Sequence, residues 1–474
     1  MFYLSTKNKS QAYSFAKAAI GGLAPDGGLY IPETIPCYRE TVRKSLQAMS
    51  FTEIAFETIM PYVQGDIPSP VLEELCNLAF PFTAPLVPVS HSANMPLSGP
   101  FLLELFHGPT AAFKDFGARF MARTFSYLRR GEGKPLTILV ATSGDTGGAV
   151  ADGFFGVEGI SVTVLYPKGR VSELQEKQIA GLGGNISALA VEGSFDDCQA
   201  LVKSAFADTV LMEKLALSSA NSINISRLIP QAVYYAAAAG KAQSGLHDDD
   251  GEATPRTMRQ AAAKSSAPQP SVPQPAAHLK GAPVTFCVPS GNFGNLTAGL
   301  YARAMGAPIA GFIAATNINK TVPEYLESGE YKTRVSQATI SNAMDVGAPS
   351  NFERMAAHWS HAELRQMIHG VSVTDDETRQ TIADVYHDYG YYLDPHGAVG
   401  WAGTQKLKAL GGALPGTIAV AATAHPAKFS ETVESITGAV PVPAAIKKAM
   451  GKTARSLTIP ADLSALRDYL LGDS

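Results

Sequence analysis

The sequence predicts an α/β protein with open twisted sheets that are covered by helices on both faces. Two segments carry this prediction, 136–155 and 284–305, because in each a continuous apolar run is followed by a glycine-rich loop and then by a small-residue helix. Strand and helix patterns alternate from 101 to 240 and again from 284 to 474, which is typical of an open α/β layer. The 474 residues exceed one compact core, so we expect at least two domains.

In chain order, residues 1–100 form an N-terminal region that we expect to be mainly helical, with amphipathic stretches such as 52–60. Apolar runs then predict buried strands at 136–141, 161–166, 284–288, 310–315 and 416–422. Between the second and third of these strands, 230–239 is typical of a helix, with Pro230 at its start and Gly240 at its end.

The composition changes abruptly between the two α/β parts. Residues 241–283 contain an acidic run at 248–252 and a run of proline and glutamine at 267–275. Such a segment has too little apolar mass to offset the entropy of ordering it, so we expect a disordered, low-complexity insertion. Two interpretations stay open: a regulatory or partner-binding loop, and a surface loop that is tolerated because long insertions cost little.

Lys114 is the first candidate for chemistry. It lies in the run 107–120, where small and apolar neighbours surround its amine and a helix is expected to start beside it. A desolvated amine loses its proton more easily than a solvated one. A nucleophile that forms a Schiff base with a carbonyl substrate or with pyridoxal phosphate needs this property. A lysine near a helix start is also commonly a solvated surface group, so this residue alone leaves both interpretations open.

Two loops have the composition of an anion cradle. The first contains Ser143, Gly144, Asp145 and Thr146 and follows the expected strand at 136–141. The second, 290–295, follows the expected strand at 284–288. Glycines let the backbone take positive φ, so that successive N–H groups can converge on phosphate oxygens at a helix start. Taken singly, each loop is equally typical of a tight turn that needs glycine for steric reasons.

Two familiar nucleotide motifs are missing from these loops. Neither loop ends in the Gly-Lys-Ser/Thr of a nucleotide P-loop. Gly291 and Gly294 have the spacing G-x-x-G, and the segment 311–317 offers no acidic residue for a ribose. A nucleotide-binding module is therefore disfavoured.

Together these segments resemble the threonine synthases, which are pyridoxal-phosphate enzymes of the tryptophan-synthase-β-like group, or fold type II. The resemblance runs over nearly the whole chain, through motifs at 3–6, 22–33, 103–110, 112–115, 290–295, 341–351, 394–396 and 423–429. It implies two open twisted α/β/α domains after a mainly helical N-terminal region. The parts of the chain would be 1–100, 101–240, the insertion 241–283, and 284–474.

The resemblance also implies how the cofactor is held. Lys114 would be the Schiff-base lysine and, once released by substrate, the proton shuttle. Backbone N–H groups would hold the cofactor phosphate, those of Gly291, Asn292, Phe293, Gly294 and Asn295. Thr423 matches the position whose hydroxyl faces the pyridine nitrogen, which leaves that nitrogen largely unprotonated. Without the resemblance, Thr423 is more typical of a strand-end hydroxyl that bonds its own backbone.

Ser143, Gly144, Asp145 and Thr146 correspond to the loop that binds the substrate carboxylate in related enzymes. Many members of the wider group have an asparagine at the position of Asp145, where it bonds the phenolic oxygen of the cofactor, whereas the synthase branch is similar to this chain in having aspartate. An anionic carboxylate would repel a phenolate. We therefore expect Asp145 to be either protonated or turned away.

The implied reaction converts O-phospho-L-homoserine and water to L-threonine and phosphate, the last step of threonine biosynthesis. Phosphate leaves from Cγ, which requires cations and hydroxyls to carry its charge. The candidates are basic or polar residues: Lys168, Asn224, Ser226, Arg227 and Lys428. Arg227 is preferred, because a guanidinium matches phosphate geometry and 221–227 resembles a segment that lines the pocket in the family. Each of them could instead be a solvated surface group.

The histidines, the cysteines and the net charge exclude several classes of function. We interpret His107, His396 and His425 as structural, and without a Cys-x-x-Cys pair we predict no metal site. The net charge of −4 includes no basic block suited to nucleic acid. Four scattered cysteines suit a reducing compartment, and neither a secretory segment nor a membrane-spanning run is present, so we expect a cytoplasmic protein.

The favoured interpretation is a pyridoxal-phosphate-dependent carbon–oxygen lyase with a small phosphorylated substrate. Another fold-type-II enzyme, such as a threonine dehydratase or a β-replacing synthase, would act on a substrate without a phosphate to release. A non-catalytic homologue would keep the fold and bind metabolites without forming the Schiff base. The sequence favours neither a monomer nor a homo-oligomer.

Overall fold

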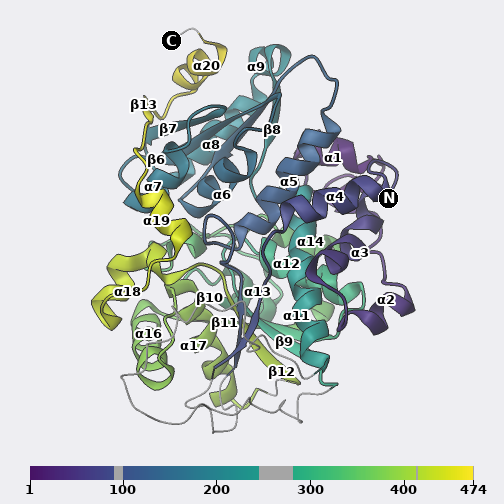
Figure 1. Cartoon of the computed structure of the whole chain (residues 1–474), viewed down its shortest axis with the longest axis vertical. Helices are drawn as coiled ribbons and strands as arrows, with labels where there is room; N and C mark the ends of the chain where they lie inside the picture. The colour runs from purple at the N-terminus through teal and green to yellow at the C-terminus, as the bar shows by residue number, and fades with distance from the viewer. Residues whose placement is uncertain (90–99, 245–280, 413–414, 473–474) are drawn as a thin grey trace.

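Two open sheets organise the chain, and a two-stranded ribbon accompanies them near the N-terminus (Figure 1). The computed structural model describes residues 1–89, 100–244, 281–412 and 415–472. The predicted insertion at 241–283 lies mostly outside the described residues. No helix of the described part is long and apolar enough to cross a lipid bilayer.

The five-stranded sheet is parallel throughout. In spatial order its strands are β13 (Leu457–Pro460), β7 (Ile186–Glu192), β6 (Ile160–Pro167), β5 (Leu136–Ala141) and β8 (Ala216–Ser219). Side chains alternate between its faces, as the pleat of a strand requires. Ile138 and Val140 belong to the core shared with α5 (Lys114–Leu128) and α6 (Asp145–Phe154), whereas Leu139 belongs to the core under α8 (Phe195–Ala207).

The six-stranded sheet is parallel except at one edge, where β3 and β4 are antiparallel. Its order is β11 (Ile368–Ser372), β10 (Ile309–Thr316), β9 (Val284–Pro289), β12 (Thr417–Ala422), β4 (Phe101–Glu104) and β3 (Leu86–Pro88). Phe286 packs in the core shared with α11 (Ala232–Ser244) and α12 (Gly294–Ala304), and Cys287 packs in the core under α17 (Pro395–Ala409). Helices therefore cover both faces of each sheet, which confirms the predicted fold class.

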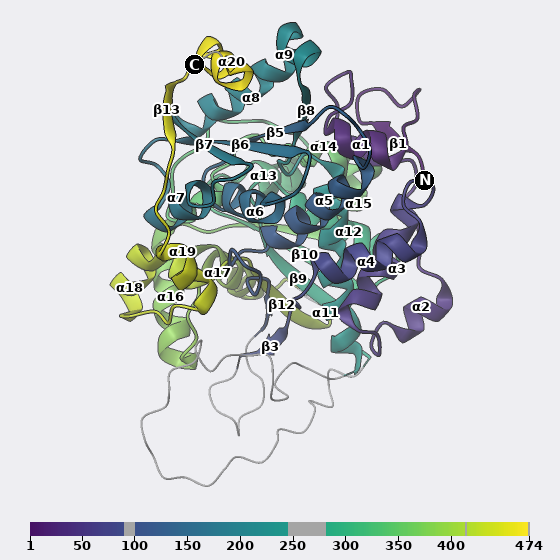
Figure 2. The same cartoon turned by 45° about the horizontal axis from the view of Figure 1, so that its top comes forward.

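Neither sheet is assembled from consecutive parts of the chain. β4 lies before the five-stranded sheet in sequence but pairs with β12 in the six-stranded one, with Phe101 opposite Ala419. Conversely, β13 comes after all strands of the six-stranded sheet and pairs with β7. Figure 2 shows this C-terminal segment, in yellow, running from α19 (Ala444–Met450) up to β13 and α20 (Leu463–Leu471).

The N-terminal region is mainly helical, as predicted. The ribbon of β1 (Tyr3–Ser5) and β2 (Tyr30–Pro32) is joined by α1 (Phe15–Gly21), α2 (Glu40–Ser45), α3 (Phe51–Val63) and α4 (Ser69–Ala79). α3 packs against α11 and α4 against α5, so this region contacts helices of both sheets (Figure 1).

One predicted helix end is wrong. The helix expected to end at Gly240 continues to Ser244, and it begins at Ala232 after a 3-10 turn that contains Pro230. A Cβ on Gly240 would lie 3.0 Å from the Leu46 backbone. The glycine therefore allows a close approach between chain segments and does not terminate the helix.

Candidate active site

The candidate site lies at the carboxyl ends of parallel strands, where open α/β sheets place their ligands. β9, β12 and β4 are neighbours in the six-stranded sheet, so the loops that follow them lie side by side. The loop after β5, from the other sheet, is joined to them by an ion pair between Asp145 and Lys428. The site therefore draws on both sheets.

Lys114 is placed by a short antiparallel contact between two of these loops. The Phe113 N–H donates to the Thr423 carbonyl at 2.8 Å, and the His425 N–H donates to the Ala111 carbonyl at 3.0 Å. Ala111 has a φ of 55°, which is uncommon for a residue with a side chain. These contacts bring Thr423 beside Lys114, which is the first residue of α5 as the sequence predicted.

The amine of Lys114 forms no hydrogen bond or ion pair with any residue that the structure describes; its ring contact is with Phe113, 5.7 Å from Nζ to the ring centroid. Burial lowers the pKa of Lys114 to about 8, and the cations Lys428 and Arg227 act in the same direction while Asp145 opposes them. A larger share of this amine is therefore neutral near pH 7 than of an ordinary lysine. An unpaired amine of this kind fits covalent binding of an aldehyde.

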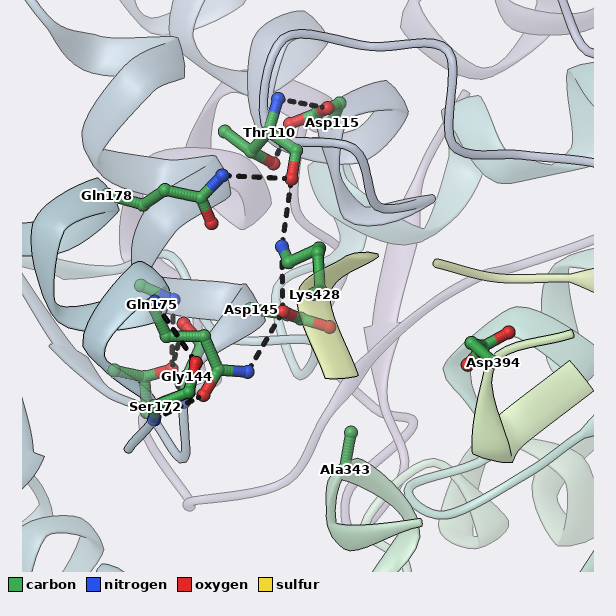
Figure 3. Close-up of polar contacts among 12 residues, drawn as sticks. Thr110, Asp115, Gly144, Asp145, Ser172, Gln175, Gln178, Ala343, Asp394 and Lys428 are labelled. Atoms are coloured by element: carbon green, nitrogen blue, oxygen red, sulfur yellow. Dashed lines mark hydrogen bonds and ion pairs between the residues drawn. The ribbon is translucent and has the colours of Figure 1, made fainter. Parts of the chain in front are cut away.

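The start of α5 is fixed by Asp115 (Figure 3). Its carboxylate accepts hydrogen bonds from the Thr110 N–H at 2.9 Å and from the Thr110 hydroxyl at 2.5 Å. Burial raises the pKa of Asp115 to about 6, although the Thr110 hydrogen bonds oppose the rise. A Cβ on Gly108 would lie 2.7 Å from the Asp115 Cβ, so the turn before Lys114 needs glycine there.

Asp145 has partners that the sequence did not indicate. Its Oδ1 lies 2.8 Å from the Lys428 Nζ and accepts from the Gln175 amide at 3.1 Å (Figure 3). Burial alone would raise the pKa of this carboxyl, but Lys428 and Lys114 hold it well below its usual range. The sequence could not show that a cation from a distant part of the chain pairs with it.

The turn at Thr110, which precedes Lys114, also contacts Lys428. The Thr110 carbonyl accepts from the Lys428 ammonium at 2.8 Å and from the Gln178 amide at 3.2 Å (Figure 3). Lys428 was a candidate for holding the leaving phosphate, but its side chain is fully buried and already has two acceptors. Gln175 and Gln178 are not predicted by the sequence patterns. The pattern Ser172-x-x-Gln175 predicts the start of α7 (Glu173–Ala180) but not the contact with Asp145.

The loop before α6 presents free backbone donors. Gly144 has a φ of 140°, and the Gln175 side chain occupies the space where a Cβ would lie. Thr142 accepts from the Gly144 and Gly147 N–H groups at 2.9 Å each. The N–H groups of Ser143, Asp145 and Thr146 donate to no residue in the described ranges. They lie at the N-terminus of a ten-residue helix, which suits a carboxylate.

The loop after β9 fits a phosphate. Phe293 has a φ of 59°, and a Cβ on Gly291 would lie 2.7 Å from the Met344 Cα. Within the described chain, none of the four N–H groups from Gly291 to Gly294 donates to a protein acceptor. Four free donors at the start of an eleven-residue helix form an anion site of the kind that a cofactor phosphate needs.

The two asparagines of this loop serve as anchors through their side chains. Asn292 donates to the Ser222 hydroxyl at 2.6 Å, and Asn295 accepts from the Tyr234 and Tyr235 hydroxyls at 2.5 and 2.7 Å. The Asn295 Nδ2 is buried and has no partner in the described chain. Their side chains thus hold the loop while its backbone donors stay available.

Arg227, Asn224 and Ser226 are all buried, but they differ in their hydrogen bonds. Arg227 is buried, and its Nη1 donates to the Ala220 carbonyl at 2.7 Å, whereas its Nε has no partner among described residues. Burial lowers the pKa of Arg227 to about 10, against the opposing effect of Asp115. Asn224 caps α10 (Ile225–Leu228), accepting from the Ser226 N–H at 3.0 Å and hydroxyl at 2.7 Å. The arginine thus retains a buried nitrogen without a partner in the described chain, and the other two residues form a local cap.

Lys168 lies apart from this arrangement. Its ammonium pairs with Glu192 at 3.1 Å, and 53% of its side chain is exposed. The histidines make local contacts: His107 lies 2.8 Å from the Glu104 carboxylate, and His425 accepts from the Ala427 N–H at 3.1 Å. His396 donates from Nδ1 to Asp394 at 2.7 Å and accepts from the Ala343 N–H at 3.3 Å. Figure 3 places Ala343 and Asp394 on the opposite side of the view from Gln178.

Comparison with known proteins covers nearly the whole chain. The family model Threonine synthase N terminus matches residues 2–80, and Threonine synthase, C-terminal matches residues 397–470. The model Pyridoxal-phosphate dependent enzyme matches residues 84–244 and 262–424, so it overlaps the C-terminal match from 397 to 424.

Individual proteins agree with these models. The chain is 39% identical over 470 residues to the threonine synthase of Escherichia coli (strain K12), with 98% of each chain covered. The crystal structure of PLP-bound threonine synthase from Brucella melitensis matches with a TM-score of 0.83 at 33% identity, over 100% of this chain and 99% of that one. Threonine deaminase isoform 2 from Solanum lycopersicum shares the fold alone, with a TM-score of 0.52 and 15% identity over 76% of this chain and 89% of that one.

The fold, the unpaired lysine and the two loops at strand ends define a pyridoxal-phosphate-dependent enzyme of fold type II. The full-length matches are more specific, and the chain belongs to the threonine synthase family. It is a pyridoxal-phosphate-dependent lyase with threonine synthase activity. A dehydratase or a non-catalytic homologue is not favoured.

Proposed function

We propose that Lys114, the Gly291–Gly294 loop and Arg227 together carry the conversion of O-phospho-L-homoserine and water to L-threonine and phosphate. The observation that carries the proposal is the amine of Lys114. It is desolvated and has no hydrogen-bonding partner in the described chain, and it lies in the same site as two loops with free N–H groups. This combination supports covalent capture of an aldehyde beside two anion sites.

The cofactor would be held by groups that have no other partner. The free N–H groups of the Gly291–Gly294 loop would bind its phosphate, and Lys114 would bind its aldehyde carbon. The Thr423 hydroxyl bonds no other described residue and lies beside the lysine loop, which supports its assignment to the ring nitrogen. When bound, pyridoxal phosphate withdraws electrons from the substrate carbon that carries the amino group, so protons on that carbon and its neighbour become easier to remove.

The substrate would be oriented by the loop before α6. The free N–H groups of Ser143, Asp145 and Thr146 would bind its carboxylate, with Gly144 giving the backbone its shape. The Lys428–Asp145 pair adds no net charge next to this carboxylate, because the two side chains neutralise each other. The pair therefore supports binding of an anionic substrate at a loop that contains an aspartate.

The proton transfers fall to Lys114. Its amine would take the proton from Cα and give it up before it takes one from Cβ; over the whole reaction one proton is delivered to Cγ and one is returned to Cα. The Cγ–O bond breaks with its electron pair leaving on phosphate, and the hydroxyl of water bonds to Cβ. The remaining proton of the water goes to the phosphate, so that atoms and charge balance and the amine ends neutral. An amine with a pKa of about 8 can both accept and return protons near neutral pH.

The departing phosphate would bind Arg227. This guanidinium is buried, forms no ion pair with a described carboxylate, and retains an unpartnered Nε. A buried cation without an anion is unfavourable until a ligand supplies the opposite charge. Lys428 is already paired, and Lys168 pairs with Glu192 at the surface, so neither competes for this role.

We also infer a cytoplasmic location. All four cysteines, Cys37, Cys76, Cys198 and Cys287, are free thiols. A reducing compartment suits such a protein.

The test is an absorbance spectrum of the purified protein with pyridoxal phosphate, before and after O-phospho-L-homoserine, with threonine and phosphate assayed together. We expect a visible band from the covalently bound cofactor, and equal amounts of both products. Lys114→Ala should lose the band and the activity, whereas the matched surface variant Lys168→Ala should keep both. A band without phosphate release would contradict the proposed substrate, and a band that persists in Lys114→Ala would contradict the lysine assignment.

A further inference from the structure

Arg354 is the largest side chain that the described chain buries completely, with 0% of it exposed. All its partners are neutral acceptors. Nε donates to the Tyr30 carbonyl at 2.9 Å, Nη1 donates to the Asn351 amide oxygen at 2.6 Å, and Nη2 donates to the Ile223 carbonyl. No described carboxylate forms an ion pair with it, although the neighbouring Glu353 opposes, from a distance, the lowering of its pKa by burial. A positive charge is therefore held in the interior without a protein anion in contact with it, which is unfavourable unless another negative group is nearby.

Arg354 lies directly behind the proposed phosphate loop. The Asn351 amide that it binds is adjacent to Gly294, since a Cβ on that glycine would lie 3.2 Å from the Asn351 Nδ2. Asn292 of the loop accepts from the Ser350 N–H at 2.5 Å and donates to the Ser222 hydroxyl at 2.6 Å. Ser222 and Ser350 thus hold the loop through Asn292, and the next residues along the chain, Ile223 and Asn351, accept hydrogen bonds from the guanidinium.

The amide of Asn351 links the charge to the loop. Its oxygen accepts from Arg354, while its Nδ2 has one long contact within the described chain, 3.5 Å to the Ser222 carbonyl. A hydrogen bond from a guanidinium polarises an amide and strengthens the donor at its other end. The loop itself adds four free backbone N–H groups at a helix start. The guanidinium, the Asn351 amide and the backbone N–H groups therefore all contribute positive potential at this loop.

We propose that Arg354 balances the charge of the cofactor phosphate from behind the Gly291–Gly294 loop and acts through Asn351. It is a positioning residue, because its contacts are with the segments that support the loop. The proposal rests on the proposed function in one respect, namely that this loop holds the phosphate. Burial lowers the pKa of Arg354 to about 10, which still leaves the guanidinium charged at neutral pH.

The discriminating experiment compares two ligands of the full-length protein after its cofactor has been removed. Pyridoxal phosphate carries the phosphate, and pyridoxal has the same ring and aldehyde without it. Their affinities are measured by titrating the visible absorbance band. For Arg354→Gln we expect the affinity for pyridoxal phosphate to fall about tenfold or more while that for pyridoxal changes less than about threefold, because only one ligand carries the charge.

Arg354→Lys is the matched variant, since it keeps the charge and loses the planar geometry. We expect it to retain most of the preference for pyridoxal phosphate. If Arg354→Gln loses both ligands equally, or keeps the preference intact, the proposal is overturned. If the wild type shows no preference for pyridoxal phosphate, the loop assignment itself fails, and the inference fails with it.

Asn351→Ala provides the test should Arg354→Gln not fold. It leaves the guanidinium in place and removes the amide between it and the loop. We expect this variant to lose part of the preference for pyridoxal phosphate and none of its affinity for pyridoxal. An unchanged preference would overturn the role of Asn351.

Discussion

The ammonium group of Lys428 lies 2.8 Å from the carboxylate of Asp145, and both side chains are buried, with 0% and 4% exposed. Asp145 follows β5 of the five-stranded sheet, and Lys428 follows β12 of the six-stranded sheet. The pair therefore joins the two sheets at the candidate site. Because the two charges neutralise each other, the Asp145 carboxylate adds no net negative charge to the candidate site.

Removing one member of this pair should be costly. Lys428→Met leaves a buried, unpaired carboxylate, and we expect the free energy of unfolding to fall by about 3–5 kcal/mol. The double variant Asp145→Asn with Lys428→Met should recover much of that loss, because neither member of the pair is then left as an unpaired charge. Urea unfolding followed by fluorescence measures both. Lys168→Met removes an exposed ion pair and should cost less than about 1 kcal/mol; a similar cost for the two lysines would contradict the assignment.

Capture of the cofactor should depend on pH through Lys114. Only the neutral amine attacks an aldehyde, and burial lowers the pKa of Lys114 to about 8. The rate at which the cofactor-free protein develops its visible band should rise about tenfold per pH unit below pH 8 and level off above it. Stopped-flow absorbance from pH 6 to 10 gives the profile. A rate that keeps rising to pH 10 would indicate an ordinary solvated lysine.

Asp115 should make stability depend on pH at the acid side. Burial raises its pKa to about 6, so between about pH 4 and 6 the folded chain retains a proton that the unfolded chain has released. Its contribution to the free energy of unfolding is complete below about pH 4 and is lost as the pH rises through 6, a change of about 3 kcal/mol. Asp115→Asn should flatten that part of the curve. Unfolding curves at pH 4, 5, 6 and 7 test the difference in slope, and parallel curves for the two proteins would exclude this role for Asp115.

Gly291 should not tolerate a side chain. A Cβ there would lie 2.7 Å from the Met344 Cα, so Gly291→Ala must displace the loop or the turn behind it. We expect the affinity for pyridoxal phosphate to fall roughly tenfold or more, since such overpacking costs about 1–3 kcal/mol. Gly133→Ala is the matched control, because no described atom lies within 4 Å of the position of its Cβ. Equal affinities of the two variants would show that the loop is not tightly packed.

Arg227 should matter for the phosphorylated substrate. Arg227→Met removes the unpaired guanidinium proposed to bind the leaving group, and we expect kcat/KM to fall about a hundredfold or more. Inhibition by inorganic phosphate should weaken in the same variant, while the visible cofactor band should persist. Steady-state kinetics with added phosphate separate these effects. Unchanged phosphate inhibition would place the leaving-group site elsewhere.

Local patterns allowed much of the fold to be predicted. The strands at 136–141 and 284–288 and the helix start at Lys114 depend on neighbours in sequence, and the structure contains them. The glycine-rich loops after those strands were identifiable for the same reason. Thr423 lies beside Lys114, although only the resemblance to a family connected the two in the sequence.

Contacts between distant segments were not predictable in this way. Asp145 pairs with Lys428, and Gln175 approaches Asp145 from another helix, and no periodicity or spacing encodes either contact. Gly240 was misinterpreted as a helix end because glycine has the same local signature at a terminus and at a close packing contact. The ranges 101–240 and 284–474 follow the order of the chain. Each sheet nevertheless takes a strand from the other range, because β4 pairs with β12 and β13 pairs with β7.

The position of β4 has a consequence for how the protein reaches its native state. This strand pairs on one side with β12, with Phe101 opposite Ala419, so it is synthesised roughly 300 residues before its partner. At elongation rates of about 5–20 residues per second, the interval is on the order of half a minute. During that time an apolar strand has left the ribosome and its eventual neighbour does not yet exist. The pairing of β4 with β12, which completes the six-stranded sheet, can therefore form only late in translation. A nascent chain that stalls before residue 417 would be a substrate for chaperones.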